Sequence, residues 1–350
     1  MLNPIGNFKP SLPCTVDTVD EFLAQPSPAT VEALSGQRGP FMVLGAGGKL
    51  GLHLCMMLRS SLEILGRSDR VIAVSRFRTL WDREEFTRRG IETLVCDLED
   101  PSALADLPDV PILFFLAGIK FGTQGSPDLL QRANVEVPKR VAERFRGALF
   151  VAFSTGCVYP FVTPASGGAT EETPPEAYGD YARSCLGRER AFIDAGRRHG
   201  TKTVLIRLNY SVEFRYGLLV DVALKIIRGV QIDVTMGYAN VIWQTDALNY
   251  AIQAVPLATV PVIALNVTGR EILSMRQIAG RFSELLNQPA HVVGKEAETA
   301  WLNNPERAYA QFGVPETSVD TMIKWVAAWV GSKGTVWDKP TGFERRDGKY

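Results

Sequence analysis

Hydrophobic and polar positions alternate in blocks along the chain from about residue 40 onwards. Six apolar runs have the length of strands: FMVLG (41–45), RVIAVS (70–75), IETLVC (91–96), VPILFFLA (110–117), ALFVAFS (148–154) and TVLIRLN (203–209). Between them, apolar residues recur at helical spacing in 49–65, 80–90, 126–145 and the stretch around Tyr181. Short buried strands alternating with helices indicate βαβ units and a parallel sheet covered on both faces. The pattern therefore predicts a doubly wound α/β fold.

The same pattern divides the chain into four regions. Residues 1–38 form a polar, proline-bearing arm with one helix expected around VDEFLAQPSPATVEAL, and residues 39–210 form the Rossmann-like dinucleotide-binding domain. From 211 to 335 the alternation gives way to amphipathic helices, including TDALNYAIQAV, which predict a smaller, mostly helical substrate lobe interleaved with the sheet edge. Residues 336–350 are a polar, irregular tail. Within the helical stretch 126–145, Pro138 is expected to break the helix.

Composition narrows the class of protein. Lys plus Arg and Asp plus Glu both number 38 among 350 residues, so no basic surface is expected for nucleic acid or an anionic membrane. No apolar run approaches the roughly 18 residues of a membrane span, and the N-terminus lacks the pattern of a signal peptide. The five scattered cysteines are those expected of a reducing cytosol, and the three histidines lack metal-ligand spacing. We therefore expect a cytoplasmic protein without a metal site.

A glycine-rich loop follows the first predicted strand and opens the first helix. Gly45, Gly48 and Gly51 form G-x-x-G-x-x-G, which lets the backbone approach a pyrophosphate at a helix N-terminus. Leu50 follows Lys49 where a Walker A loop would need Ser or Thr, so that loop is excluded.

The second predicted strand bears on the choice of dinucleotide. Ser75 falls 24 residues after Gly51, where NAD enzymes carry an acidic residue, and Arg76 follows it. A serine and an arginine suit a 2′-phosphate, which favours NADP over NAD.

Several motifs in order resemble the extended short-chain dehydrogenase/reductase family of NAD(P)-dependent epimerases and dehydratases. Besides the glycine loop, these are CDLED (96–100), FLAGIKFG (115–122), ANVEVP (133–138), FSTGCVYP (153–160), YARSCLGRE (181–189) and RLNYSV (207–212). The resemblance implies that Tyr181 is the catalytic acid/base and that Thr155 is the catalytic hydroxyl, with Ser154 beside it. Lys120 joins these three as a candidate catalytic residue because it follows the fourth strand at the carboxyl edge of the sheet. Residues expected to bind the cofactor are Gly45, Gly48, Lys49, Leu50, Gly51, Ser75, Arg76, Asp97, Leu98, Leu116, Ala117, Gly118, Asn134, Tyr181, Cys185 and Asn209.

Two departures from the family pattern shape the expected chemistry. Cys185 stands where the family has the lysine of Tyr-x-x-x-Lys, so the pKa of Tyr181 is expected near its unperturbed value of about 10. Lys120 or the positive charge of an oxidised nicotinamide ring could compensate in part. In MGYANVIWQTDA, Ala239 and Asn240 replace the arginine that holds the diphosphate of a nucleotide sugar. A smaller sugar, polyol or sugar acid is therefore expected instead.

The sequence supports an enzyme first and a binding protein second. The first hypothesis is an NAD(P)-dependent oxidoreductase, epimerase or dehydratase in which Tyr181 exchanges a proton with the substrate and the nicotinamide exchanges a hydride. The alternative is a cofactor sensor without turnover. Thiol chemistry at Cys157 or Cys185 is disfavoured because no histidine lies nearby in sequence, and Tyr178 matches the motif less well than Tyr181. The resemblance also implies a homodimer formed through the helices near 126–146 and 177–197.

Overall fold

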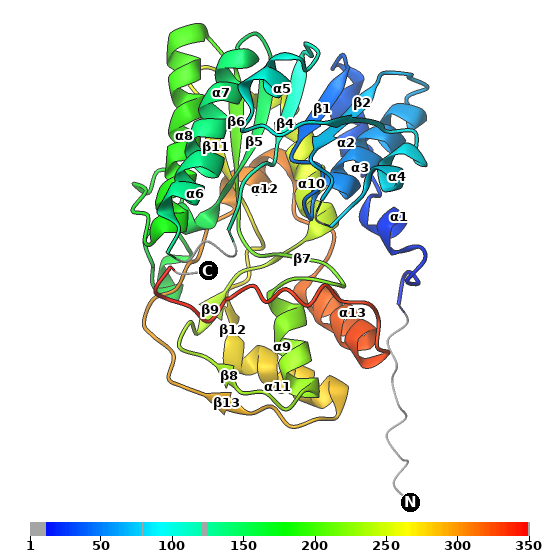
Figure 1. The fold of residues 1–350 in the computed structure, drawn as a ribbon. Coiled ribbons are helices and arrows are strands. Elements are labelled where there is room, and N and C mark those ends of the chain that lie inside the picture. Colours follow the sequence, from blue (N-terminus) through cyan, green and yellow to red (C-terminus); the bar gives the residue numbers. More distant parts are fainter. Residues whose placement is uncertain (1–11, 79, 121–124, 349–350) are drawn as a thin grey trace, which may run out of the picture.

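A seven-stranded parallel sheet forms the centre of the molecule, shown in a computed structural model that describes residues 12–78, 80–120 and 125–348 (Figure 1). Its strand order is β11-β6-β5-β4-β1-β2-β3, and every neighbouring pair is parallel. The strands are β1 (Phe41–Leu44), β2 (Val71–Ser75), β3 (Glu92–Val95), β4 (Ile112–Phe115), β5 (Leu149–Thr155), β6 (Thr203–Leu208) and β11 (Ile263–Val267). The first six are the predicted strands. The seventh, β11, was not predicted, because the buried Asn266 interrupts its apolar run.

Helices cover both faces of the sheet, so the doubly wound prediction is confirmed. One face carries α2 (Pro28–Ser35), α3 (Gly51–Ile64), α10 (Gln244–Gln253) and α12 (Glu306–Phe312); the other carries α5 (Pro101–Ala105), α7 (Val137–Arg144) and α8 (Asp180–His199). The helix α10 lies in the segment predicted as the substrate lobe, but it packs against α2 and α3 over the sheet. Its apolar side chains, such as Leu248 and Ile252, are fully buried there.

The N-terminal segment contains two helices where the sequence predicted one. These are α1 (Val19–Leu23) and α2, and Ser27 separates them by capping α2, accepting a hydrogen bond from the Thr30 N–H. Pro28 takes the first helical position, where its missing N–H costs nothing. Both helices are packed on the rest of the molecule, since Leu23 and Leu34 are completely buried.

A π-helix, Arg132–Glu136, joins α6 (Pro127–Gln131) to α7 and replaces the break predicted at Pro138. Pro138 is buried in the first turn of α7, where a proline is tolerated. The wider turn contains Asn134, whose side chain both accepts from the N–H and donates to the carbonyl of Ile119 after β4. Such π-turns occur often at functional sites.

The smaller lobe is built on three helices, α9 (Leu218–Ile227), α11 (Met275–Leu286) and α13 (Val319–Gly331). They enclose aromatic side chains that include Phe214, Trp243 and Trp329. Short strand pairs complete the lobe: β7 (Ser211–Val212) with β10 (Ile242–Trp243), β8 (Ile232–Asp233) with β13 (Val292–Val293), and β9 (Tyr238–Ala239) with β12 (Leu273–Ser274). One further short helix, α4 (Arg83–Thr87), lies before β3.

Residues 332–348, here called the C-terminal strap, leave α13 and run across the lobe without helix or strand, as the red segment of Figure 1 shows. The strap is docked, because Thr341 donates two hydrogen bonds to Asp221 and the Arg346 guanidinium lies over the ring of Phe161. Its end packs on Gly179, just before α8. In the described part of the chain, no helix is long and apolar enough to cross a membrane.

Candidate active site

The site lies where the strand order of the sheet reverses. β1 and β4 are neighbours, but the chain continues from them to opposite sides, to β2 and β5. In open α/β sheets ligands bind at this switch point, beyond the carboxyl ends of the strands. The glycine loop follows β1, and the loop containing Gly118 and Lys120 follows β4.

Gly45 and Gly48 have different surroundings in the glycine loop. Gly45 has a φ of +86°, and a Cβ there would lie 2.5 Å from the Ala117 nitrogen, so it allows the loop to pack against the end of β4. Gly48 is exposed, and a Cβ there would meet nothing nearer than the Gly45 carbonyl oxygen at 3.4 Å. Its side-chain position faces open space, which leaves room for a ligand to approach the backbone.

A groove of about 310 Å³ runs along this loop. It is lined by Gly45, Gly48, Lys49, Leu50, Leu116, Gly118, Ile119, Lys120, Phe153, Tyr181, Arg188 and Tyr216. Three of these described lining residues are Lys or Arg and none is acidic. The helix α3 begins beside this groove, after Leu50, and no side chain caps its N-terminus. Helix N-termini attract anions through their dipole and their free N–H groups.

At the far end of the predicted cofactor site, the end of β2 carries Ser75 followed by Arg76. Neither side chain can accept hydrogen bonds from both ribose hydroxyls, as a carboxylate would. Ser75 ends β2 and accepts a hydrogen bond from the Phe77 N–H at 3.2 Å. Arg76 is 53% exposed and lies 3.6 Å from a carboxylate oxygen of Asp97. The arginine is thus held by a weak surface ion pair that a phosphate could replace.

Two predicted cofactor residues, Asn134 and Asn209, have buried side chains that hydrogen-bond within the protein. Asn134 is completely buried and holds Ile119, Ser184 and Arg188 by hydrogen bonds. Asn209 is buried after β6, where its side chain donates to Asn240. Both therefore position the site's loops.

A second cavity, of about 190 Å³, adjoins the groove. It shares Lys49, Leu50, Lys120, Tyr181 and Tyr216 with the groove, so these side chains border both spaces. Its other lining residues are Ser154, Thr155, Cys157, Leu208, Asn209, Tyr210, Ser211, Leu218, Gln244 and Thr341. The structure thus brings together the predicted catalytic residues on one cavity wall, next to the glycine loop.

The two predicted hydroxyl residues on β5 have different surroundings. Thr155 accepts a hydrogen bond from the Cys157 N–H, which leaves its hydroxyl proton to be donated. Ser154 instead donates to Glu189 at 2.5 Å, and Glu189 forms a buried ion pair with Arg207. The Ser154 hydroxyl therefore already makes a structural hydrogen bond next to the site.

Tyr181 and Cys185 are hydrogen-bonded to each other, one turn apart on α8. Burial raises the pKa of Tyr181 well above its usual value of 10, and the neighbouring Cys185 raises it further, while Arg188 opposes the shift. The expectation of a pKa near 10 was wrong because it weighed the missing lysine but left out desolvation. The phenol is protonated at neutral pH.

The central part of the chain matches a known family. Residues 41–212 fit the model of the NAD-dependent epimerase/dehydratase family. This segment belongs to that family. The resemblance to the extended short-chain dehydrogenase/reductases is thereby confirmed, and with it the class of NAD-dependent enzymes. The search of curated proteins found no match.

Solved structures with the same fold extend the comparison beyond the matched segment. UDP-glucose 4-epimerase from Thermus thermophilus, in complex with NAD, is 18% identical, with 82% of this chain and 97% of that chain covered and a TM-score of 0.68. The Bordetella bronchiseptica enzyme WbmG, in complex with NAD, is 18% identical over 86% and 96% of the two chains, with a TM-score of 0.69. MoeE5, in complex with UDP-glucose and NAD, is 17% identical over 84% and 99%, with a TM-score of 0.66. At these identities the likeness is one of fold.

Arg188 is a positively charged residue of the site that was not among the residues predicted from the sequence. It follows Tyr181 and Cys185 on the same face of α8, and its guanidinium donates to the Phe153 carbonyl and to Asn134. The spacing i, i+4, i+7 in YARSCLGRE was a signal that could have found it. Lys120 is a second cation here, with its ammonium 5.5 Å from the centre of the Tyr181 ring.

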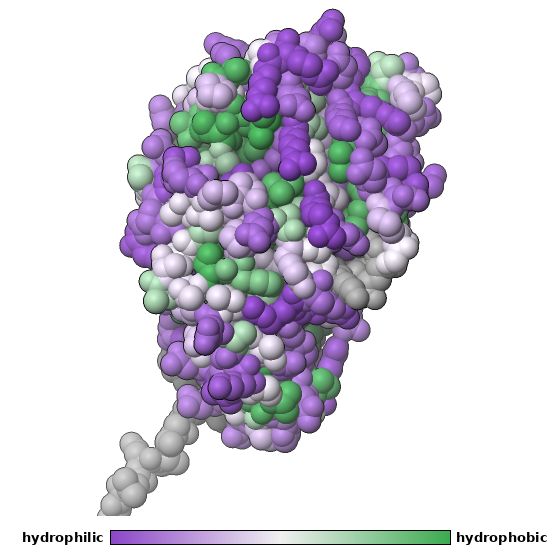
Figure 2. All heavy atoms as spheres, turned by 90° about the vertical axis from the view of Figure 1, so that its left-hand side faces the viewer, coloured by the Kyte–Doolittle hydropathy of each residue, from purple (hydrophilic) through white to green (hydrophobic). Residues whose placement is uncertain are grey.

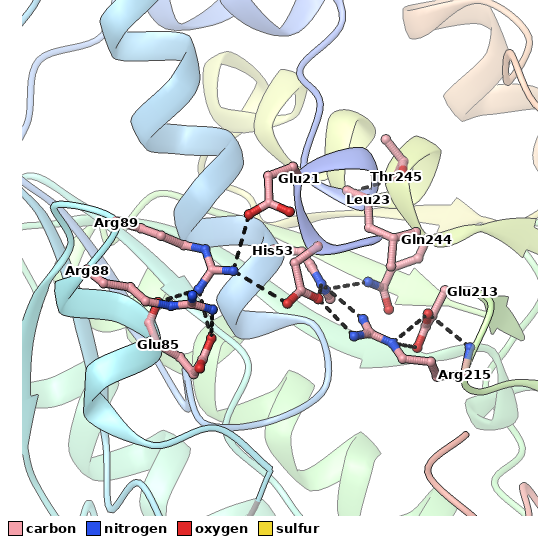
Figure 3. Close-up of polar contacts among 11 residues, drawn as sticks. Glu21, Leu23, His53, Glu85, Arg88, Arg89, Glu213, Arg215, Gln244 and Thr245 are labelled. Atoms are coloured by element: carbon pink, nitrogen blue, oxygen red, sulfur yellow. Dashed lines mark hydrogen bonds and ion pairs between the residues drawn. The ribbon is translucent and has the colours of Figure 1, made fainter. Parts of the chain in front are cut away.

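A buried polar network supports the cavity from behind (Figure 3). His53 on α3 bonds Asp20 on α1 at 2.9 Å, and Gln244 on α10 lies 2.8 Å from the other imidazole nitrogen. Arg215 contacts the same Asp20 at 2.9 Å and pairs with the buried Glu213. These contacts connect the N-terminal segment, the helices α3 and α10, and the loop after β7.

The network fixes one wall of the site through Arg215. Its guanidinium lies against the rings of Trp81 and Trp337, and its carbonyl accepts from the Trp337 N–H of the strap. The next residue, Tyr216, places its ring 3.0 Å below the ammonium of Lys49. The N-terminal segment and the strap thus both help to hold a residue shared by groove and cavity.

Proposed function

We propose that this protein is an NAD(P)-dependent oxidoreductase or epimerase/dehydratase acting on a small carbohydrate-like substrate. The observation that carries the proposal is that the cavity lined by Tyr181 and Thr155 adjoins the glycine-loop groove and shares five lining residues with it. A cofactor in the groove and a substrate in the cavity would meet at their shared residues. The bound nicotinamide cofactor would supply or accept the hydride.

The side chains of the cavity handle the proton and the reacting oxygen. Tyr181 donates its phenolic proton to a carbonyl oxygen, and the Thr155 hydroxyl donates a hydrogen bond to the same atom. Arg188 and Lys120 offset the negative charge that develops on the phenol. Because the pKa of Tyr181 is raised, the phenol is present in the protonated form that a proton donor needs and not as the phenolate that proton abstraction needs, although the same shift weakens it as an acid. Reduction, or a reaction with a transient keto intermediate, is therefore favoured over simple alcohol oxidation.

The size of the cavity supports a small substrate. Its volume of about 190 Å³ is below the roughly 300–1,000 Å³ of pockets that bury drug-sized ligands. Thr341 of the strap forms part of its wall. Asn240, at the position expected to hold a diphosphate, is completely buried and bonded to Gly269 and Asn303. These features favour a sugar, polyol or sugar acid over the nucleotide sugars named for some of the structural relatives.

The preferred cofactor in this proposal is NADP. Ser75 and Arg76 offer a hydroxyl and a guanidinium at the end of β2, where a 2′-phosphate would lie, and no carboxylate competes from β2 itself. NAD is the alternative.

We further propose a cytoplasmic homodimer formed through α6–α8. All five cysteines are buried and unpaired, in keeping with a reducing compartment. On α7 and α8 the outward residues carry both signs of charge, for example Arg140, Glu143, Arg190 and Asp194. Figure 2, which faces this side of the molecule, shows mostly hydrophilic atoms with smaller hydrophobic groups between them. A two-fold contact here would therefore depend on matching opposite charges.

One observation favours the alternative of a sensor without turnover, namely the raised pKa of the catalytic phenol. Native mass spectrometry of the purified protein, followed by incubation of the loaded protein with keto-sugars and polyols, separates the two. We expect a bound dinucleotide and a change in nicotinamide fluorescence with at least one substrate. A bound cofactor that stays unchanged with the whole panel, at pH values up to about 10, would favour the sensor.

A further inference from the structure

Four consecutive residues after β6 line the cavity, although an extended chain would present only every second side chain to it. These residues are Leu208, Asn209, Tyr210 and Ser211. Successive side chains of a strand point to opposite faces. Tyr210 interrupts this alternation, because its φ is +40°, in the left-handed region that aromatic residues rarely adopt. The left-handed turn allows Tyr210 and Ser211 to face the same cavity.

The unusual backbone of Tyr210 is fixed from both sides. The N–H of Asn209 donates to the carbonyl of Val267 in β11, and the carbonyl of Tyr210 accepts from the N–H of Ile242 in β10. Beyond Ser211 the side chain of Val212 is completely buried in the smaller lobe. Strained backbone persists only where its surroundings determine it, and it is found most often at active sites and ligand-binding sites. The conformation of Tyr210 therefore points to a role in the cavity.

Tyr210 and Ser211 both carry a hydroxyl group that makes no hydrogen bond within the described part of the chain. The Ser211 hydroxyl is buried and unpaired. No other described residue hydrogen-bonds the Tyr210 hydroxyl, although the Tyr210 ring packs on the hydrophobic core of the smaller lobe. Burial raises the pKa of Tyr210 well above its usual value of 10, so this phenol keeps its proton at neutral pH. Because an unpaired buried polar group costs free energy, a ligand that supplies the missing bonds would be stabilised here.

We propose that Tyr210 and Ser211 select the substrate by hydrogen-bonding two of its hydroxyl groups. Tyr181 and Thr155 line the same cavity and take the reacting oxygen. This inference rests on the proposed function for that oxygen and adds the residues that recognise the rest of the substrate. A phenol and an alcohol can each donate and accept a hydrogen bond, which matches the hydroxyl groups of a sugar or polyol. A carbonyl compound without further hydroxyl groups would leave both side chains unpaired, so the site should discriminate against it.

A competing explanation makes both residues purely structural, with the Tyr210 ring filling space against the smaller lobe. Variants that remove only the hydroxyl groups separate the two explanations. Tyr210→Phe keeps the ring, and Ser211→Ala keeps the Cβ. Tyr178→Phe and Ser68→Ala, at exposed positions, are the matched controls.

The test compares the wild-type protein with these variants, all saturated with oxidised cofactor, by ligand-observed NMR titration. The probes are D-glucose, D-galactose and D-mannose, with cyclohexanone as a six-membered ring compound without hydroxyl groups. We expect at least one sugar to bind more tightly than cyclohexanone. Tyr210→Phe and Ser211→Ala should each weaken the binding of that sugar by about 2- to 12-fold, the range of one neutral hydrogen bond. The affinities for cyclohexanone and for the cofactor should stay within about twofold, as should all affinities of the two controls.

The melting temperature supplies a readout that a structural role would move in the opposite direction. Ser211→Ala removes an unpaired buried hydroxyl, so its melting temperature should equal or exceed that of the wild-type protein. A hydroxyl that stabilises the fold would give a lower value.

Three results would overturn the inference: no sugar binding more tightly than cyclohexanone, unchanged sugar binding in either variant, or equal losses of sugar and cyclohexanone binding with a lower melting temperature. Turnover of the same compounds tests the proposed reaction separately. Sugar binding that depends on both hydroxyl groups, without turnover of any compound, would support the inference and contradict the reaction. Turnover of cyclohexanone with reduced cofactor, without binding of any sugar, would support the reaction and contradict the inference.

Discussion

Replacing Lys120 by Met should make Tyr181 a much poorer acid. The ammonium lies 5.5 Å from the phenol ring, and a unit charge at that distance in an effective dielectric constant of 20 is worth about 3 kcal/mol. This corresponds to a change of about 2 in the pKa of the phenol, and to at most about 100-fold in rate, the limit for complete proton transfer in the transition state. The positive charge stabilises the phenolate, so its removal raises the pKa of Tyr181 still further. Carbonyl reduction should slow by about 10- to 100-fold at pH 7.

The assay is the loss of reduced-nicotinamide absorbance with a turned-over substrate between about pH 6 and 10. Burial lowers the pKa of Lys120, so the wild-type advantage should shrink as pH rises and the lysine loses its proton. Lys139→Met serves as the control. The double variant Lys120→Met/Cys185→Lys should recover part of the lost rate, because it returns a cation to the family's position on α8. A loss of less than threefold in Lys120→Met, with an unchanged pH profile, would refute the role of Lys120 and leave Arg188 as the acting cation.

Three further predictions concern the cofactor, the thiol and the assembly. Arg76→Ala should weaken NADPH binding about tenfold and NADH binding less than twofold, measured by fluorescence titration, and an equal loss for both would contradict the 2′-phosphate assignment. Cys185→Ser should keep activity within about threefold, because serine preserves the hydrogen bond with Tyr181, and loss of activity with cofactor still bound would make the thiol a participant. Light scattering at tens of micromolar should give a dimer whose dissociation increases with salt, whereas a monomer at low salt would exclude the contact through α6–α8.

The parts of the fold that depend on local pattern were predictable. Apolar runs such as FMVL and ILFF are buried on both faces of the sheet, and the glycine loop stands where its spacing placed it. Thr155 and Tyr181 were found through motifs, and the chain brings them to one cavity. In these cases a few residues that are neighbours in the sequence are enough to predict the local structure or the site residue.

The parts that depend on distant contacts were not predictable in the same way. The strand β11 has a buried Asn266, which is satisfied by the carbonyls of Ala169 and Asn304 far away in sequence. The helix α10 packs over the sheet through contacts with α2 and α3, which lie far away in sequence. The raised pKa of Tyr181 follows from burial that the sequence alone does not display. The strap was read as polar, yet its Phe343 is buried in the lobe.

The most direct test of the central claim is hydride transfer by Tyr181→Phe compared with the wild-type protein in a single turnover. The phenyl ring keeps the packing of α8 but has no proton to donate. We expect the wild-type protein to convert bound reduced cofactor and a carbonyl substrate, while Tyr181→Phe binds the cofactor with unchanged affinity and transfers hydride at least about 100-fold more slowly. Equal rates for the two proteins would contradict the account, because Tyr181 would then not be the acid of this site.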